Sequence, residues 1–202
     1  MAKKAAKKKA PAKKTASKSK KASARRSAPA RRAAAPKKPS YKPERVGDVI
    51  ANLILKDAAA AIDFYKSVFG ARELRRFNMP DGKIGHAELR IGDTTVFLND
   101  ESPMGSGVAA SPEHKSTFTI QLYVPDVDAT YNRALQAGAK STMAVADMFW
   151  GDRMSSIADP FGQLWAISTK VKDMTDAEMM KAGEDFIKQM AQGGPPSAAS
   201  AT

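Results

Sequence analysis

The chain has 202 residues, a net charge of +12, 43% apolar residues and no cysteine. This length and apolar content allow one domain of ordinary size with appendages, and the lack of cysteine excludes a disulfide framework, a thiolate nucleophile and a Cys-ligated zinc site. No stretch has the apolar length of a membrane span or of a secretory signal, so we expect a cytoplasmic protein.

The first 43 residues contain almost only Ala, Lys, Arg, Pro and Ser. They hold 17 of the 33 Lys and Arg residues and no Asp or Glu, which leaves 16 basic and 21 acidic residues in the other 159. Such a segment has too little apolar surface to offset the entropy of ordering, so we expect a disordered tail. Its composition resembles a linker-histone tail and predicts sequence-independent, salt-sensitive binding to nucleic acid, most simply DNA, or to another polyanion.

The expected phosphate contacts of this tail come from its clustered basic residues. They are Lys7, Lys8, Lys9, Lys13, Lys14, Lys20, Lys21, Arg25, Arg26, Arg31, Arg32, Lys37 and Lys38. If the tail binds nucleic acid, we expect the cytoplasmic protein to associate with the nucleoid. Two alternatives remain open. The tail could adhere nonspecifically to any anionic surface, membrane headgroups included, or it could be a mitochondrial presequence whose apolar face consists only of Ala.

After Tyr41 the sequence alternates between strand and helix patterns. Residues 49–55 form an apolar run typical of a buried strand, and Asp57 and Gly70 have the properties of the N-cap and the closing residue of a helix over 58–69. Three strand patterns separated by turn signals follow. They cover residues 72–78, 86–91 and 94–99.

A Gly, Ser and Pro-rich connection leads into a second half with the same plan. A strand over 117–124 and a helix over 126–137, closed by Gly138, precede three more strands. Those strands are predicted near residues 140–145, 153–158 and 163–169. The surroundings of the two predicted N-caps, Asp57 and Asp126, match at an offset of 68 or 69 residues, which indicates an internal repeat of a βαβββ module.

The C-terminal part begins with a capping box, Thr175 to Glu178, which predicts a helix to about Ala191. Its Met-rich face, with Met174, Met179, Met180 and Met190, is expected to pack adaptably. The predicted organisation is a disordered tail, a duplicated domain, this helix and a disordered end. Their bounds are 1–43, 47–172 (module one 47–101, connection 102–116, module two 117–172), 173–191 and 192–202.

The repeated module, with Phe69-Gly70-Ala71 after its first helix and a closing Asp159-Pro160-Phe161-Gly162, resembles the glyoxalase, bleomycin-resistance and extradiol dioxygenase (vicinal oxygen chelate) superfamily. Trp150-Gly151-Asp152-Arg153 with Leu164-Trp165 is similar to its PhnB-like branch. The resemblance covers about residues 47–190. It implies an α+β fold in which two modules curl their sheets into a cleft with the helices outside, and we also expect a homodimer.

In this superfamily, four inward-projecting residues can hold a divalent metal. The corresponding positions in this sequence are Ile50, Thr119, Ala166 and, through the repeat offset, Leu98. None of these side chains is an imidazole or a carboxylate, the usual ligands of such sites. We therefore expect no metal and no cofactor, with a relocated metal site at His86 and Glu88 as the alternative.

Strand alternation, anchored on the inward positions, predicts which residues line the cleft. Ala87, Leu89 and Ile91 would pack under a helix and leave His86, Glu88 and Arg90 on the other face. The expected ligand-binding residues are Asn52, Glu88, Thr119, Gln121, Tyr123, Trp150 and Arg153. This mixture of polar and apolar groups suits a small organic ligand, with Arg153 as a clamp for an oxyanion.

Several of these residues also have a structural interpretation. Arg153 can hold its loop by pairing with Asp152 or Asp159. Tyr123 and Trp165 can be core or dimer-interface aromatics. Glu88 and Arg90 can form an exposed ion pair on a solvated face.

Three functions remain open. The first is a metal-free binding module for a small organic ligand, which its tail holds near nucleic acid. The second is a lyase or dioxygenase in which His86 and Glu88 are the catalytic candidates, His86 as a proton shuttle. The third is a dimerisation platform that makes the tail bivalent. No nucleophile elbow, phosphate-binding glycine loop, dinucleotide fingerprint or zinc spacing occurs in the sequence.

Overall fold

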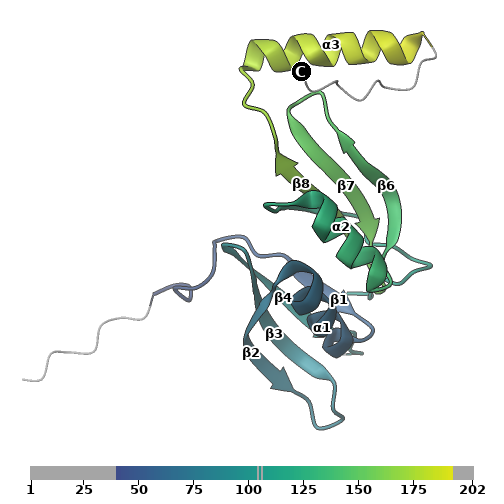
Figure 1. The fold of residues 1–202 in the computed structure, drawn as a ribbon. Coiled ribbons are helices and arrows are strands. Elements are labelled where there is room, and N and C mark those ends of the chain that lie inside the picture. Colours follow the sequence, from purple (N-terminus) through teal and green to yellow (C-terminus); the bar gives the residue numbers. More distant parts are fainter. Residues whose placement is uncertain (1–39, 104, 106, 193–202) are drawn as a thin grey trace, which may run out of the picture. The chain divides into compact units, whose positions relative to one another are not determined.

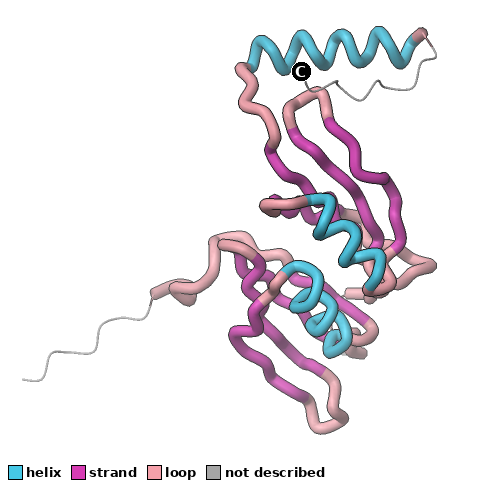
Figure 2. Tube along the Cα trace, in the orientation of Figure 1, coloured by secondary structure: helices cyan, strands magenta, loops and turns pink. Residues whose placement is uncertain are grey.

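The computed structural model describes residues 40–103, 105 and 107–192 (Figure 1, Figure 2). The predicted phosphate contacts at residues 7–38 and most of the predicted disordered end therefore lie outside the described residues. The described elements form two successive groups, each with one strand, one helix and three further strands, followed by a last helix. This order confirms the predicted α+β class and the duplicated βαβββ plan.

Module one forms a four-stranded sheet, here called sheet A, in the order β1-β4-β3-β2. Its elements are β1 (Asn52–Leu55), α1 (Ala58–Phe69), β2 (Arg72–Asn78), β3 (Ile84–Ile91) and β4 (Thr94–Asp100). β1 is parallel to β4, and the other neighbours are antiparallel. The chain therefore leaves β1 through α1 and returns beside it at the end of a three-stranded meander.

Module two repeats this arrangement in sheet B, with the strand order β5-β8-β7-β6. Its elements are β5 (Thr119–Tyr123), α2 (Val127–Gln136), β6 (Lys140–Asp147), β7 (Asp152–Ala158) and β8 (Leu164–Lys170). β5 is parallel to β8, as β1 is to β4. The sequence repeat thus corresponds to a repeat of strand topology.

α1 begins and ends where its sequence indicates. The Asp57 side chain accepts the Ala60 backbone N–H at 2.9 Å, and Gly70 closes the helix with a left-handed φ of 66°, which favours glycine. The buried face of the helix consists of apolar side chains of different sizes. They are Ala58, Ala61, Ile62, Phe64, Tyr65 and Val68. Burial of this face against sheet A supplies the core of module one.

β1 starts three residues later than predicted, and β3 starts two residues earlier. Val49 is 93% exposed, so the first part of the apolar run precedes the sheet. The Ile84 N–H donates to the Asp100 carboxylate at 2.6 Å, which fixes the start of β3. Asp100 also accepts the Ala58 N–H at 2.7 Å and so joins the first turn of α1 to sheet A.

The two modules contact each other through their helices. The Arg133 guanidinium of α2 donates to the Val68 carbonyl oxygen of α1 at 3.2 Å. The Tyr65 hydroxyl of α1 donates to the Asp159 carboxylate at 2.8 Å, and its ring lies 5.3 Å from that of Trp165. Each helix also contacts the apolar face of its own sheet. We call the opposite face of each sheet, which no described helix covers, its open face.

The last helix, α3 (Asp176–Ala191), starts with the predicted capping box. The Thr175 N–H donates to the Glu178 carboxylate at 2.8 Å, and the Thr175 hydroxyl accepts the Glu178 N–H at 3.3 Å. No residue of α3 is buried, and Met180 and Met190 are 71% and 53% exposed, whereas Met174, just before the helix, is half-buried beside Gly151. The expected packing is therefore found at Met174 and not at Met180 or Met190. Within the described ranges, no helix combines the length and apolar character that crossing a bilayer requires.

The turn between β7 and β8 contacts the connection between the modules, and this contact is testable. At Gly162 (φ 88°) a Cβ would lie 2.2 Å from the Ser111 carbonyl oxygen, whereas at Gly82 (φ 85°), in the β2–β3 turn, it would meet nothing within 4 Å. A Cβ at positive φ costs about 1–2 kcal/mol, and displacing packed atoms adds roughly 1–3 kcal/mol. We therefore expect Gly162→Ala to lower the midpoint of thermal unfolding, followed by circular dichroism, several degrees more than Gly82→Ala. Equal shifts would contradict the contact.

Candidate functional site

Side-chain alternation along β3 divides its residues between the two faces of sheet A. The residues under α1 are Ala87, Leu89 and Ile91, and those on the open face are His86, Glu88 and Arg90. The register of the β2–β3 pair places Arg75 opposite Glu88, and Arg72 opposite Arg90. Paired residues of neighbouring strands share a face, so β2 adds two arginines to the open face.

Glu88 lies at the centre of a charged cluster on this open face. Its side chain is only 6% exposed, and cationic groups or imidazole approach it from three residues. Arg45 Nη2 lies 3.8 Å from Glu88 Oε2, and Arg75 Nη1 and His86 Nε2 each lie 3.7 Å from Oε1. These distances are longer than direct hydrogen bonds. The guanidinium N–H groups are therefore not saturated by Glu88.

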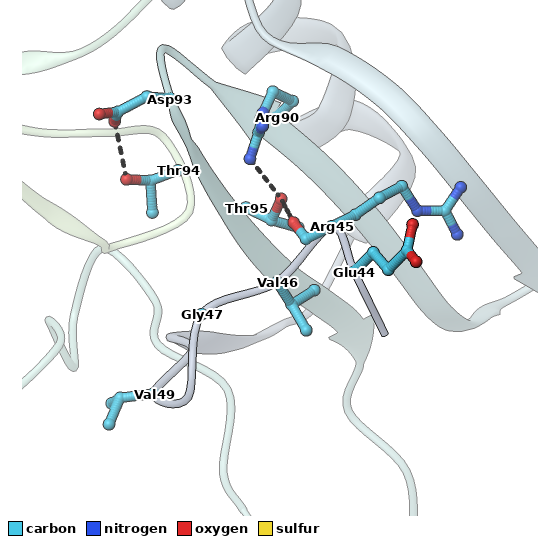
Figure 3. Close-up of a pocket in the computed structure, with 9 residues that line it drawn as sticks. All are labelled: Glu44, Arg45, Val46, Gly47, Val49, Arg90, Asp93, Thr94 and Thr95. Atoms are coloured by element: carbon cyan, nitrogen blue, oxygen red, sulfur yellow. Dashed lines mark hydrogen bonds between the residues drawn. The ribbon is translucent and has the colours of Figure 1, made fainter. Parts of the chain in front are cut away.

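A hollow of about 380 Å³ adjoins this cluster (Figure 3). Its lining comes from the chain before β1 and from the β3–β4 hairpin. The residues are Glu44, Arg45, Val46, Gly47, Val49, Arg90, Asp93, Thr94 and Thr95. Arg90 Nη1 donates to the Thr95 hydroxyl at 3.2 Å, and that hydroxyl donates to the Arg45 carbonyl oxygen at 2.9 Å. These hydrogen bonds fix Arg90 at the border between the hollow and the cluster.

The open face of sheet B carries two aromatic side chains held by one carboxylate. The buried Asp152 accepts the Tyr123 hydroxyl at 2.8 Å and the Trp150 indole N–H at 3.2 Å, both on Oδ2. The hydrogen bond to Asp152 raises the pKa of the Tyr123 hydroxyl above its ordinary value, so this group stays a neutral donor at physiological pH. The Tyr123 side chain is nevertheless 61% exposed and accessible to a ligand.

Two polar residues continue this face along β5. Thr119 and Gln121 alternate with the partly buried Ile120, and the Gln121 Nε2 amide donates to the fully buried Ser168 hydroxyl at 2.8 Å. The side-chain carbonyl oxygen of Gln121, Oε1, has no hydrogen-bond partner among the described residues. The β5 side of the open face therefore offers a hydroxyl, an amide and an aromatic ring in one row.

Arg153 is held by carboxylates from α2 and β6. Its Nε and Nη2 donate to Asp128 at 2.7 and 2.8 Å, and its Nη1 donates to Asp147 at 3.0 Å. These hydrogen bonds raise the pKa of the Arg153 guanidinium. The ion-pair interpretation named Asp152 or Asp159 as the partner, and the structure gives Asp128 and Asp147 instead. A ligand oxyanion would have to displace one of these carboxylates.

One of the four positions that the resemblance assigns to metal ligands needs correction. Leu98 is fully buried in the core beneath α1, so its prediction as an inward residue is wrong. The preceding residue, Phe97, lies on the open face, because a shift of one residue changes the face of a strand. Within the part of the chain that the structure describes, no three His, Asp or Glu residues gather closely enough to hold a metal ion.

The sequence-predicted site residues fall into two groups that no described contact joins. Asn52, His86 and Glu88 belong to sheet A. The others belong to module two, with Thr119, Gln121 and Tyr123 on β5, Arg153 on β7 and Trp150 in the turn before β7. The sequence reasoning missed Arg45, Arg75 and the role of Asp152. Arg75 follows a β-bulge after Glu73 that shifts the alternation, and Arg45 precedes any regular element, so neither has a periodic signal.

Comparison with known proteins gives relatives for most of the folded part. A sequence model of the Glyoxalase/Bleomycin resistance protein/Dioxygenase superfamily matches residues 48–167. The uncharacterized protein Rv0887c of Mycobacterium tuberculosis is 46% identical over 134 residues, which are 65% of this chain and 79% of the relative. The uncharacterized protein At5g48480 of Arabidopsis thaliana is 29% identical over 124 residues, 57% of this chain and 74% of the relative.

Solved structures show the same fold. TioX from Micromonospora sp. ML1 is 28% identical with a TM-score of 0.50, covering 61% of this chain and 98% of TioX. The fosfomycin resistance protein FosX from Listeria monocytogenes, solved with Mn(II) and sulfate, is 16% identical with a TM-score of 0.50. The match covers 67% of this chain and 95% of FosX. At this identity the similarity shows only that the two proteins share a fold. With paired βαβββ modules and a family match over more than half of its residues, the chain belongs to the glyoxalase/bleomycin resistance protein/dioxygenase superfamily.

Proposed function

We propose that this protein is a metal-free member of its superfamily that binds a small organic ligand on the open faces of its sheets. The observation that carries the proposal is the combination of fixed hydrogen-bonding groups and accessible aromatic rings on faces that no described helix covers. The four positions that the superfamily can use for a metal hold Ile50, Phe97, Thr119 and Ala166. None of these is a usual metal ligand.

The sheet B face supports a ligand with an apolar or aromatic part. Asp152 fixes both Tyr123 and Trp150, so their rings lose little conformational entropy when a ligand binds. Aromatic side chains with a polar handle are frequent contact residues in binding sites. Thr119 and Gln121 on the neighbouring positions would determine how a polar group of the ligand is oriented.

The arrangement of the helices favours a homodimer. Within one chain α1 and α2 contact each other, and each covers the apolar face of its own sheet, so both open faces lie on the sides away from the helices. A cleft between two open faces would then need a second copy of the chain. We propose that sheet A of one protomer lies opposite sheet B of its partner, which would enclose the ligand and bring the two groups of site residues together.

The basic tail supplies the second part of the proposed function. Residues 1–43 contain 17 Lys and Arg and no acidic residue, and such a segment binds polyanions through counterion release. The domain would thereby stay near nucleic acid in the cytoplasm or nucleoid, and a dimer would present two tails and raise their effective concentration. A dimerisation platform without any ligand is the simplest alternative.

A second candidate function is catalysis at a relocated site. The observation that favours it is the 3.7 Å distance between His86 Nε2 and the Glu88 carboxylate on an open face. An imidazole beside a carboxylate can move a proton to or from a bound substrate. The superfamily contains lyases and dioxygenases, so a lyase or dioxygenase using His86 and Glu88 would be the corresponding enzyme.

Native mass spectrometry of the full-length, tag-free protein, with elemental analysis, tests the first proposal. We expect a dimer without stoichiometric metal and with a small organic molecule that is released on denaturation. Tyr123→Ala should decrease the retained molecule, whereas Tyr41→Ala, at an exposed tyrosine outside both sheets, should leave it unchanged. One bound metal per chain would instead favour a lyase or dioxygenase. A dimer that retains no small molecule from cell extract would favour a dimerisation platform for the basic tail.

A further inference from the structure

Two arginines face each other across neighbouring strands of sheet A. Arg72 of β2 is the direct register partner of Arg90 of β3, so both side chains rise from the open face. Among residues 40–103, 105 and 107–192, neither guanidinium has a carboxylate within 4 Å. Like charges directly opposite each other weaken a strand pair. This pair therefore destabilises the sheet unless an anion lies between the two guanidinium groups.

The same face carries two more arginines and a single carboxylate. Arg45 and Arg75 lie 3.8 and 3.7 Å from Glu88, whose side chain is 6% exposed. Arg72 and Arg90 bring the guanidinium groups of this region to four, and its carboxylates are Glu88 together with Glu44 and Asp93 of the adjoining hollow, which leaves one positive charge in excess, on the side of Arg72. The Arg45 and Arg75 side chains are 48% and 59% exposed, so an anion from solvent can reach their guanidinium groups.

The hollow next to Arg90 differs in character from this face. Glu44 and Asp93 line it and offset Arg45 and Arg90, the two arginines that the hollow shares with the open face (Figure 3). Its volume of about 380 Å³ falls in the range of roughly 300–1,000 Å³ that is usual for small-molecule pockets. A ligand that spans both places would therefore have an anionic end over the strands and an uncharged end in the hollow.

From this arrangement we infer that the open face of sheet A binds a doubly charged anionic group, of the phosphate or dicarboxylate kind, on a small molecule whose uncharged part occupies the hollow. The inference rests on the proposed ligand-binding function and narrows it to a chemical class. A guanidinium fork matches two oxygens of such a group. Glu88 is a positioning residue that keeps Arg45 and Arg75 over the face.

Thermal unfolding of the full chain, with inorganic phosphate, succinate or chloride at equal ionic strength and about pH 8, where phosphate is a dianion, tests this inference. We expect at least one dianion to raise the midpoint relative to chloride, and above its dissociation constant the rise should follow the logarithm of its concentration. Arg72→Gln and Arg90→Gln should each weaken the apparent affinity about tenfold, the loss of one charge-assisted contact. Without an anion, Arg72→Gln should be at least as stable as the wild type, because the like-charge pair is removed.

Arg76→Gln is the matched control. Arg76 also lies on β2, and its guanidinium already donates to Glu73 at 2.8 and 3.0 Å, so this variant changes the net charge equally while leaving the four arginines of the open face. It should keep its affinity within about twofold. The tail is identical in all variants, so their comparison cancels its contribution.

The outcomes separate the sources of the anionic group and the two proposals. A response to phosphate alone assigns a phosphate group, and a response to succinate alone assigns a dicarboxylate. An equal loss of affinity in Arg76→Gln and Arg90→Gln, or no response of the wild type to either dianion, overturns the inference. If the wild type responds to neither dianion but native mass spectrometry finds a bound uncharged molecule, the proposed ligand-binding function would still be supported.

Discussion

Replacing Asp159 with Ala is expected to lower the free energy of unfolding by about 3–5 kcal/mol, because each buried donor left without an acceptor costs about 1–3 kcal/mol. This loss corresponds to roughly 10 °C in the thermal midpoint of a domain of this size. Its Oδ2 accepts the Tyr65 hydroxyl at 2.8 Å and the Trp165 indole N–H at 3.0 Å. Its Oδ1 accepts the N–H groups of Phe161 and Gln163, both at 2.9 Å. In the variant these four donors lose their acceptor. In the native protein the same carboxylate also links α1 of module one to the β7–β8 turn of module two.

The expected loss is smaller than the sum of four hydrogen bonds. Burial raises the pKa of Asp159 although Trp165 and Tyr65 hydrogen-bond to its charged form, so the native carboxylate carries a desolvation cost that the Ala variant removes. Urea unfolding of the purified protein gives the free energy directly.

Two variants serve as controls for this experiment. Tyr65→Phe removes one donor and keeps the ring packing, so it should cost about 0.5–1.5 kcal/mol. Asp81→Ala, in the β2–β3 turn, removes a carboxylate that accepts only the Lys83 N–H at 3.1 Å on the surface, and it should cost less than about 1 kcal/mol. If Asp159→Ala were no more costly than Asp81→Ala, the cross-module network would not stabilise the fold.

Much of the fold could be predicted because its signals are local. The N-cap at Asp57, the left-handed residue at Gly70 and the capping box at Thr175 each depend on a few neighbouring residues, and all three are confirmed. The alternation along β3 likewise separates buried from open-face residues. The interpretation of Trp165 as a core residue agrees with its burial, which contact with Tyr65 and Phe69 explains.

The candidate site was less predictable because it depends on register and on irregular backbone. The repeat offset of 68 selects Leu98 and the offset of 69 selects Phe97, and the pairing of Phe97 with Glu88 shows that Phe97 is the residue on the open face. The partners of Arg153 come from α2 and β6, 25 and 6 residues away, and no local pattern identifies them. Long-range pairing of this kind follows from packing of elements, which a single sequence does not specify.

A chain that begins at Tyr41 should lose nearly all of the affinity for duplex DNA that the full-length protein has at low salt. The truncation removes 16 Lys and Arg residues and no acidic residue, which changes the net charge from +12 to −4. If the tail neutralises 6 or more phosphates, affinity for DNA should fall roughly 10³-fold or more between 50 and 200 mM salt in the full-length protein. Fluorescence anisotropy across a salt series measures both the affinity and its slope.

A full-length chain with the residues of 1–40 in scrambled order is the control for this prediction, because counterion release depends on the number of cationic groups and not on their order. It should bind with the same affinity and the same salt slope as the native order. Tail-independent binding would instead place the contact on the folded domain, where the open face of sheet A holds four arginines. Loss of binding in Arg72→Gln and Arg90→Gln would then identify that face as the polyanion site.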